Sequence, residues 1–125
     1  MEKHKILVVD DEADICSCLK SYFEKRDFTV STSGKGLEAL SMMRSSKYDV
    51  VLLDLSLPDL NGDRVLEELR KNDKETKVII VTGNEDATEK AMLSKLGVQG
   101  YCIKPMPPKQ LLGAVHKALG LPLVE

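Results

Sequence analysis

Five short apolar runs alternate along the chain with segments of helical periodicity. The clearest runs are rich in β-branched residues, apolar throughout and too short for a helix, as expected of strands buried on both faces. The expected strands are Ile6–Val9, Phe28–Ser31, Val50–Leu53, Val78–Val81 and Gly100–Ile103. Five strand–helix units with short connections predict a parallel sheet that is covered by helices on both sides.

Apolar residues three and four positions apart mark the five expected helices. They are Ile15, Cys18, Leu19, Tyr22 and Phe23 in the first helix, Leu37, Leu40 and Met43 in the second, Val65, Leu66 and Leu69 in the third, Met92, Leu93 and Leu96 in the fourth, and Leu111, Leu112, Val115 and Leu119 in the fifth. The pattern predicts a single domain over residues 1–125 with a core at about 4–120. Residues 121–125 are then a frayed end or the start of a linker.

Composition narrows the classes of function. The formal net charge is −2 and no basic stripe is visible, which argues against direct binding of nucleic acid. The amino terminus does not read as a signal peptide, and no apolar run approaches the length of a membrane span. Three cysteines cannot all pair, which favours the reducing cytoplasm. Cys16 and Cys18 point in different directions on a helix, so we expect one packed and one surface thiol and no zinc site.

Polar side chains follow four of the five expected strands. Asp10 and Asp11 follow the first, Asp54 the third, Thr82 the fourth and Lys104 the fifth. The carboxyl ends of parallel strands share one rim, where ligands bind. A polar residue is ordinary at any one strand end, but three converging carboxylates repel one another unless a cation lies among them. Oxygen ligands favour Mg²⁺, and neither histidine lies near this rim to suggest zinc.

Two side chains at this rim suit an anion. Lys104 either neutralises the carboxylates or holds an anion that arrives on one of them, and Thr82 could donate a hydrogen bond to that anion. A carboxylate, a metal ion, a lysine and a hydroxyl around one point are the parts of a phosphoryl-transfer site.

Four strings of the sequence resemble the receiver domains of two-component response regulators. They are Ile6–Glu12, Asp49–Gly62, Val78–Gly83 and Tyr101–Pro105, and the resemblance covers nearly the whole chain. It implies a flavodoxin-like (βα)5 three-layer sandwich whose five-stranded parallel sheet has the order 2-1-3-4-5. It also suggests a cis bond between Lys104 and Pro105.

The resemblance assigns a role to each rim residue. Asp54 corresponds to the phospho-acceptor, Asp11 to the carboxylate bound directly to Mg²⁺, and Asp10 to one acting on the ion mainly through water. The backbone carbonyl of Ser56 takes the place of the third protein ligand. Thr82 and Lys104 then correspond to the phosphoryl-sensing hydroxyl and the charge partner.

Tyr101 has two interpretations. It is either an amphipathic residue on an edge strand with its hydroxyl in water, or, by resemblance, the aromatic switch that follows Thr82 inward. The switch would reshape the face of the fourth helix, fifth strand and fifth helix, through which an output domain, a downstream protein or a second copy would bind. Met106 stands where many relatives have an aromatic residue, and Ser56 and Asn84 lie where the family tunes phosphate lifetime.

The implied function is phosphorelay signalling: a sensor histidine kinase or histidine phosphotransfer protein supplies a phosphoryl group, which the domain later removes from itself. The domain is then no enzyme beyond these two steps. Three alternatives stay open. A phosphatase of the haloacid dehalogenase type needs a second acid where Ser56 stands, a pseudo-receiver would leave the acidic set unused, and a flavin protein would rest on the loop Ser31–Gly36. His4 and His116 are interpreted as surface residues.

Overall fold

The computed structural model describes residues 3–83 and 86–122, in which five strands alternate with five helices. In chain order the elements are β1 (His4–Val9), α1 (Ala13–Glu24), β2 (Phe28–Ser33), α2 (Gly36–Ser45), β3 (Val50–Leu53), α3 (Gly62–Arg70), β4 (Lys77–Thr82), α4 (Ala87–Leu96), β5 (Gly100–Ile103) and α5 (Pro108–Leu119). The alternation expected from the sequence is therefore confirmed.

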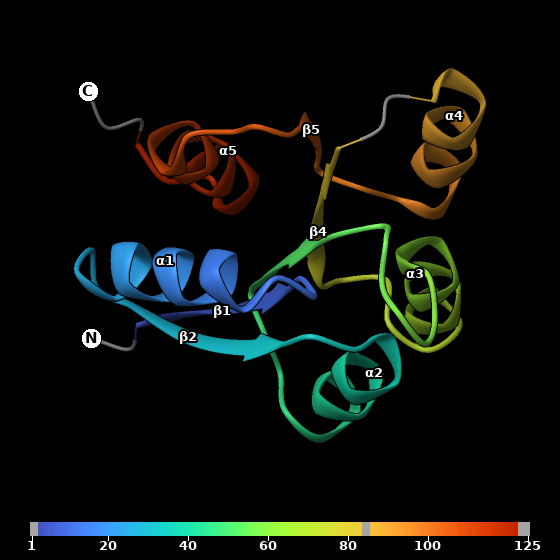
Figure 1. Cartoon of the computed structure of the whole chain (residues 1–125), viewed down its shortest axis with the longest axis horizontal. Helices are drawn as coiled ribbons and strands as arrows, with labels where there is room; N and C mark the ends of the chain where they lie inside the picture. Colours follow the sequence, from blue (N-terminus) through green and yellow to red (C-terminus); the bar gives the residue numbers. More distant parts are fainter. Residues whose placement is uncertain (1–2, 84–85, 123–125) are drawn as a thin grey trace.

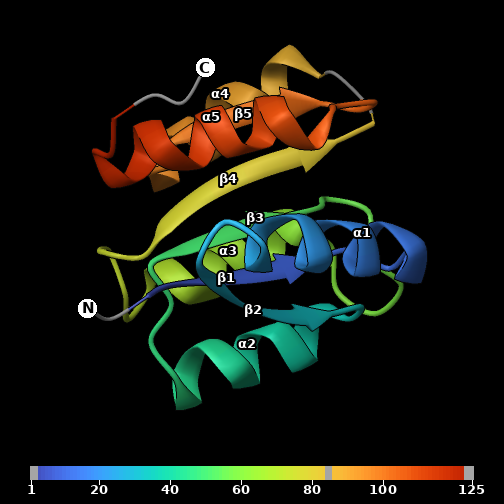
Figure 2. The same cartoon turned by 90° about the vertical axis from the view of Figure 1, so that its left-hand side faces the viewer.

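The five strands form one parallel sheet in the order β2-β1-β3-β4-β5. Helices α1 and α5 cover one face, and α2, α3 and α4 cover the other (Figure 1). Figure 2 shows the same layers from the side of α1 and α5. This is the three-layer, flavodoxin-like arrangement that was expected, with β1 and β3 adjacent at the point where the strand order reverses.

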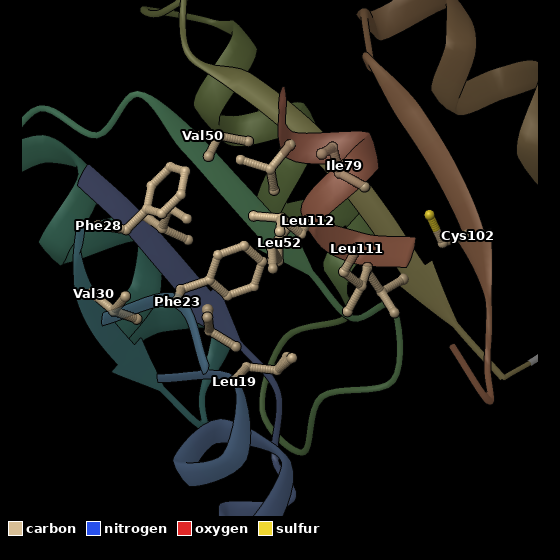
Figure 3. Packing of buried hydrophobic residues seen from close by; sticks show 14 of the residues in the cluster. Leu19, Phe23, Phe28, Val30, Val50, Leu52, Ile79, Cys102, Leu111 and Leu112 are labelled. Atoms are coloured by element: carbon tan, nitrogen blue, oxygen red, sulfur yellow. The ribbon is translucent and has the colours of Figure 1, made fainter. Parts of the chain in front are cut away.

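Burial on both faces explains why the central strands are apolar throughout. Along β1, Ile6 and Val8 join the cluster under α1 and α5, while Leu7 and Val9 join the cluster under α2, α3 and α4. Figure 3 shows the first of these clusters, in which Phe23 of α1 lies among strand and α5 side chains. Alternate side chains of a strand point to opposite faces, so each central strand supports two cores.

Three strands are longer than their apolar runs. β1 begins at His4, β2 continues to Ser33, and β4 runs from Lys77 to Thr82. Of the added residues, His4, Lys5, Thr32 and Lys77 are exposed or half-buried at strand ends or on the edge strand β2, whereas Ser33 and Thr82 are buried at the carboxyl edge of the sheet. Thr82 is consequently the last residue of β4 rather than the residue after it.

The apolar stripes of α2 and α4 are narrower than the sequence suggested. Leu37 is 61% exposed and Met92 is 49% exposed, so the expectation that both lie on a buried face is wrong. Leu93 is the single buried residue of α4. Of the two cysteines of α1 one is packed and one is at the surface, as expected, but the exposed one is Cys18, which the sequence had placed on the apolar face. Over the described residues, no helix is both long and apolar enough to cross a membrane.

Candidate functional site

The carboxyl edge of the sheet brings Asp10 and Asp54 side by side. They follow β1 and β3, whose last residues, Val9 and Leu53, are paired in the sheet. The backbone N–H of Asp54 donates to the carbonyl oxygen of Val9 at 2.9 Å, and that of Asp10 donates to the carbonyl oxygen of Ser33 at 3.0 Å. The sheet's own hydrogen bonds therefore continue one residue beyond the strands and fix the backbone of both aspartates.

Lys104 joins the two carboxylates. Its Nζ lies 2.8 Å from Asp10 Oδ2 and 3.0 Å from Asp54 Oδ2, although it is 94 and 50 residues away from them in sequence. The aspartates are only 4% and 5% exposed, so these ion pairs are poorly screened by water. Partial burial lowers the pKa of Lys104, but its hydrogen bonds to Asp10 and then Asp54 outweigh this and raise it, so the ammonium stays charged.

The second oxygen of each buried carboxylate accepts a backbone hydrogen bond. Asp10 Oδ1 accepts from the N–H of Glu12 at 2.9 Å, and Asp54 Oδ1 accepts from the N–H of Ser56 at 3.0 Å. Each carboxylate is held at both oxygens, by a backbone N–H on one side and by Lys104 on the other. The orientation of Asp54 is thus set before any ligand arrives.

The exposed Asp11 completes an acidic cluster. Each of Asp10, Asp11 and Asp54 offers a carboxylate oxygen, and the three oxygens all lie within 4.8 Å of one another. Oxygen donors at this spacing, with Asp11 open to solvent, fit a hard divalent cation that keeps several waters, as Mg²⁺ does. His4 and His116 lie instead beside Phe28, with ring centroids 6.3 and 6.1 Å from its ring. His4 is the first residue of β1.

Thr82 stands on the same edge, one strand further along. It is 2% exposed and pairs with Ile103 across the sheet, and its carbonyl oxygen accepts the backbone N–H of Lys104 at 2.7 Å. The peptide bond between Lys104 and Pro105 is cis, as the resemblance suggested. Thr82 and Lys104 are therefore linked directly through the backbone at the carboxyl edge.

Tyr101 lies on the face of the sheet that α4 covers. Its ring packs against the cluster that contains Leu93, and Lys90 Nζ of α4 is 5.2 Å from the ring centroid. The hydroxyl oxygen is buried, so the interpretation in which it stands in water does not describe this structure. The partly buried ring, with the Lys90 ammonium over it, connects β5 to α4.

Ser56 and Asn84 are the two residues at positions expected to tune the lifetime of the phosphoryl group. Ser56 is exposed, and its backbone N–H donates to Asp54 Oδ1. Asn84 lies outside the described residues. Met106 is partly buried against the first core cluster and lines a cavity of about 490 Å³ beside Asp54 and Lys104. This cavity opens between α1 and α5 and gives a small ligand a route to the buried carboxylates.

Two residues that support the site from behind, Gly62 and Asp59, were not predicted from the sequence. Gly62 packs so tightly that a Cβ there would overlap the carbonyl oxygen of Asp54 and lie 2.8 Å from Leu55 Cα. Asp59 fastens the loop between β3 and α3 to α2 through hydrogen bonds to Gly36 and Leu37. No local pattern in the sequence shows what a loop residue of this kind touches.

Comparison with known proteins defines the family. The family model of the response regulator receiver domain matches residues 6–116 of the sequence. The uncharacterized transcriptional regulatory protein YkoG of Bacillus subtilis is 36% identical over 95% of this chain and 52% of its own length. The transcriptional regulatory protein SrrA of Staphylococcus aureus is 33% identical over 93% of this chain and 48% of its own length.

Solved structures agree with the sequence relatives. The CheY-like response regulator receiver domain protein from Methanospirillum hungatei superimposes with a TM-score of 0.91 at 28% identity, covering 94% of both chains. The BeF3-activated receiver domain of Klebsiella pneumoniae RstA gives 0.85 at 26% identity, covering 93% of this chain and 98% of that one. The chain belongs to the response regulator receiver domain family. It spans about half the length of the curated relatives it matches.

Membership in this family places the chain among signalling domains of two-component systems rather than classical enzymes. The alternatives of a haloacid dehalogenase phosphatase and of a flavin protein are left without support. A pseudo-receiver has the same fold but is not phosphorylated. It therefore differs from the main hypothesis only in whether Asp54 accepts a phosphoryl group.

Proposed function

We propose that Asp54 accepts a phosphoryl group from the phosphohistidine of a sensor kinase or histidine phosphotransfer protein. The observation that carries this proposal is the environment of its carboxylate, which is buried and held at one oxygen by Ser56 N–H and at the other by Lys104. A carboxylate fixed in this way can attack phosphorus without first losing a full shell of water and side-chain freedom.

In the transfer, an oxygen of Asp54 forms a bond to phosphorus while the bond from phosphorus to the donor's imidazole nitrogen breaks. The electron pair of that bond leaves with the imidazole. Lys104 exchanges its carboxylate contact for the incoming phosphoryl oxygens and keeps a positive charge beside them, since its pKa is raised. Asp10 and Asp11 would hold Mg²⁺ together with Asp54 and the Ser56 carbonyl. When bound, the ion neutralises charge on the transferred group.

The same domain is proposed to remove the phosphoryl group by hydrolysis. The acyl phosphate on Asp54 is cleaved when water attacks phosphorus and the carboxylate leaves. Ser56 is exposed and stands two residues from the acceptor, where a small polar side chain leaves room for that water. The proposed result is a signal with a finite lifetime.

Phosphorylation is proposed to act on the face formed by α4, β5 and α5. Thr82 and Lys104 are joined through the backbone, and Tyr101 connects β5 to α4. Because Leu93 is the one buried residue of α4, this helix can repack at lower cost than its neighbours. A phosphoryl group that binds one arrangement of this face more tightly shifts the population toward it.

The partners of this face are proposed from the relatives. The curated relatives that are named transcriptional regulators are about twice the length of this chain, so an output domain in the same protein or a separate downstream protein is the expected recipient. A homodimer formed on phosphorylation would use the same face. Size-exclusion chromatography with and without beryllofluoride tests for this homodimer. The free thiols of Cys16, Cys18 and Cys102 suit a reducing cytoplasm, which is the proposed location.

Phosphorylation by acetyl phosphate and Mg²⁺, followed by intact mass, tests the proposal. The wild-type chain should gain one phosphoryl group, and Asp54→Asn should gain none. Asp49→Asn is the matched control, because Asp49 precedes β3 at the opposite edge of the sheet. Its carboxylate accepts a hydrogen bond from the backbone N–H of Lys5. An unlabelled wild type, under conditions that label another receiver domain, would support the pseudo-receiver instead.

A further inference from the structure

The amino terminus of α2 is capped by a residue from a different part of the chain. Its N-cap, Lys35, makes no side-chain hydrogen bond to the helix. The carboxylate of Asp59, 23 residues after Gly36, takes over this role. Asp59 Oδ1 accepts the backbone N–H of Gly36 at 2.8 Å, and Oδ2 accepts that of Leu37 at 3.1 Å. Two N–H groups that lack partners within the helix are thereby satisfied from outside it.

The charge on Asp59 suits this position. Desolvation raises its pKa, but the backbone hydrogen bonds from Leu37 and Gly36 outweigh that effect and lower it. The carboxylate is therefore ionised at neutral pH and faces the positive end of the helix dipole. The contact joins the loop between β3 and α3, residues 54–61, to α2.

Close packing fixes the same loop at two further points. A Cβ on Gly36 would overlap the carbonyl oxygen of Leu60 and would lie 2.9 Å from Val65 Cγ2. At the other end of the loop, the N–H of Gly62 donates to the carbonyl oxygen of Leu55 at 2.9 Å. The loop is thus closed on itself by Gly62 and held against α2 by Asp59 and Gly36.

This loop carries the part of the site that faces the proposed metal. It begins at Asp54, and its Ser56 supplies the N–H that orients Asp54 Oδ1. We propose that Asp59 is a positioning residue: by anchoring the loop to α2, it holds the Ser56 backbone in place and so sets the affinity of the site for Mg²⁺. The proposal rests on the proposed function, since it assumes that Mg²⁺ binds among Asp10, Asp11 and Asp54.

Asp59 acts without touching the ion. Its two oxygens are occupied by α2, so its effect reaches the site through the backbone of Leu57 and Pro58. Loss of the anchor leaves the three carboxylates in place but lets the Ser56 backbone sample other positions. Residues that orient a metal ligand from behind typically change affinity by about tenfold to a hundredfold, and we expect about tenfold here because the loop remains tethered by Gly62.

The test is a Mg²⁺ titration of the whole chain followed by the shifts of backbone amide resonances in nuclear magnetic resonance spectra. The variants are Asp59→Ala, which removes both acceptors, and Asp59→Asn, which keeps one oxygen. Asp73→Ala is the matched control. Asp73 also accepts two backbone N–H groups, from Glu75 and Thr76 at 2.9 and 3.0 Å, but it precedes β4 at the opposite edge of the sheet.

The expected dissociation constant rises about tenfold in Asp59→Ala, rises less in Asp59→Asn and is unchanged in Asp73→Ala. An Asp59→Ala chain that keeps its fold and the wild-type affinity would overturn the positioning role. Equal losses in Asp59→Ala and Asp73→Ala would also overturn it, because a general loss of negative charge rather than the anchor to α2 would then act on the ion. A wild type that binds no Mg²⁺ would instead refute the proposed function, and the role of Asp59 with it.

Discussion

Alanine at Gly62 and at Gly113 should have opposite effects on stability. Both glycines lie in helices, Gly62 at the start of α3 and Gly113 within α5, and neither has a positive φ. Their surroundings differ. A Cβ on Gly62 would overlap the carbonyl oxygen of Asp54 and approach Leu55 Cα to 2.8 Å, whereas a Cβ on Gly113 would meet no atom within 4 Å.

The magnitudes follow from these contacts. At Gly113, alanine reduces the freedom of the unfolded chain and favours the helix, which should stabilise the protein by about 0.5–1 kcal/mol. The same gain exists at Gly62, but the groups that must move there are backbone atoms at the site. Overpacking typically costs about 1–3 kcal/mol, and a clash with backbone atoms lies near the upper end of this range, so after the gain of about 0.5–1 kcal/mol the net loss for Gly62→Ala is about 2 kcal/mol.

Urea unfolding of the two variants and the wild type measures both signs in one experiment. Because the Asp54 carbonyl is displaced, Gly62→Ala should also accept phosphate from acetyl phosphate more slowly, while Gly113→Ala should match the wild type. The reasoning would be refuted if Gly62→Ala were as stable as Gly113→Ala, since the loop would then yield without cost.

Three further changes probe the contacts around the site. Lys104→Met should lower the free energy of unfolding without Mg²⁺ by about 3 kcal/mol, because two buried carboxylates lose their cation, and Mg²⁺ should stabilise this variant more than the wild type in urea titrations. Desolvation raises the pKa of Asp73, but the hydrogen bonds from Thr76 and other groups outweigh this and lower it. The ionised carboxylate therefore stabilises the folded protein above the ordinary pKa of about 3.9, and this stabilisation is lost as pH falls through the lower pKa of the folded state. Melting of Asp73→Asn between acidic and neutral pH should therefore show a deficit that shrinks below about pH 4, and a constant deficit would contradict this sign. Arg70→Met should lower the free energy of unfolding by about 3 kcal/mol and speed amide hydrogen exchange at the end of α4. The buried guanidinium donates to carbonyl oxygens there, including that of Gly97 at 2.7 Å. Unchanged exchange would count against this role of Arg70.

The strands and the rim residues were predictable because strands that are buried on both faces are apolar at every position. A run such as Val50–Leu53 has no polar position, and the first polar residue after it is necessarily near the carboxyl edge. Asp10, Asp54 and Lys104 could therefore be expected to meet, and they do. Their mutual contact follows from strand order, which the family resemblance supplied.

The contacts of loops were not predictable in the same way. Asp59 reaches α2 across 23 residues, and no periodicity in the sequence marks which loop residue will cap which helix. The exposure of Met92 has a related origin. α4 has the apolar spacing of an ordinary amphipathic helix, but only Leu93 is buried and Leu96 is partly buried, so the spacing overstated how much of the helix is buried.

The most direct test of the central claim assigns the phosphoryl group to one residue. Asp10, Asp11 and Asp54 offer oxygens within 4.8 Å of one another, so a mass increase alone does not say which carboxylate reacts. Borohydride reduction converts an aspartyl phosphate into homoserine, which peptide mass spectrometry then locates. Homoserine at position 54 is the predicted result. Homoserine at position 10 or 11, or a phosphoryl group retained on a histidine, would contradict the assignment of Asp54 as the acceptor.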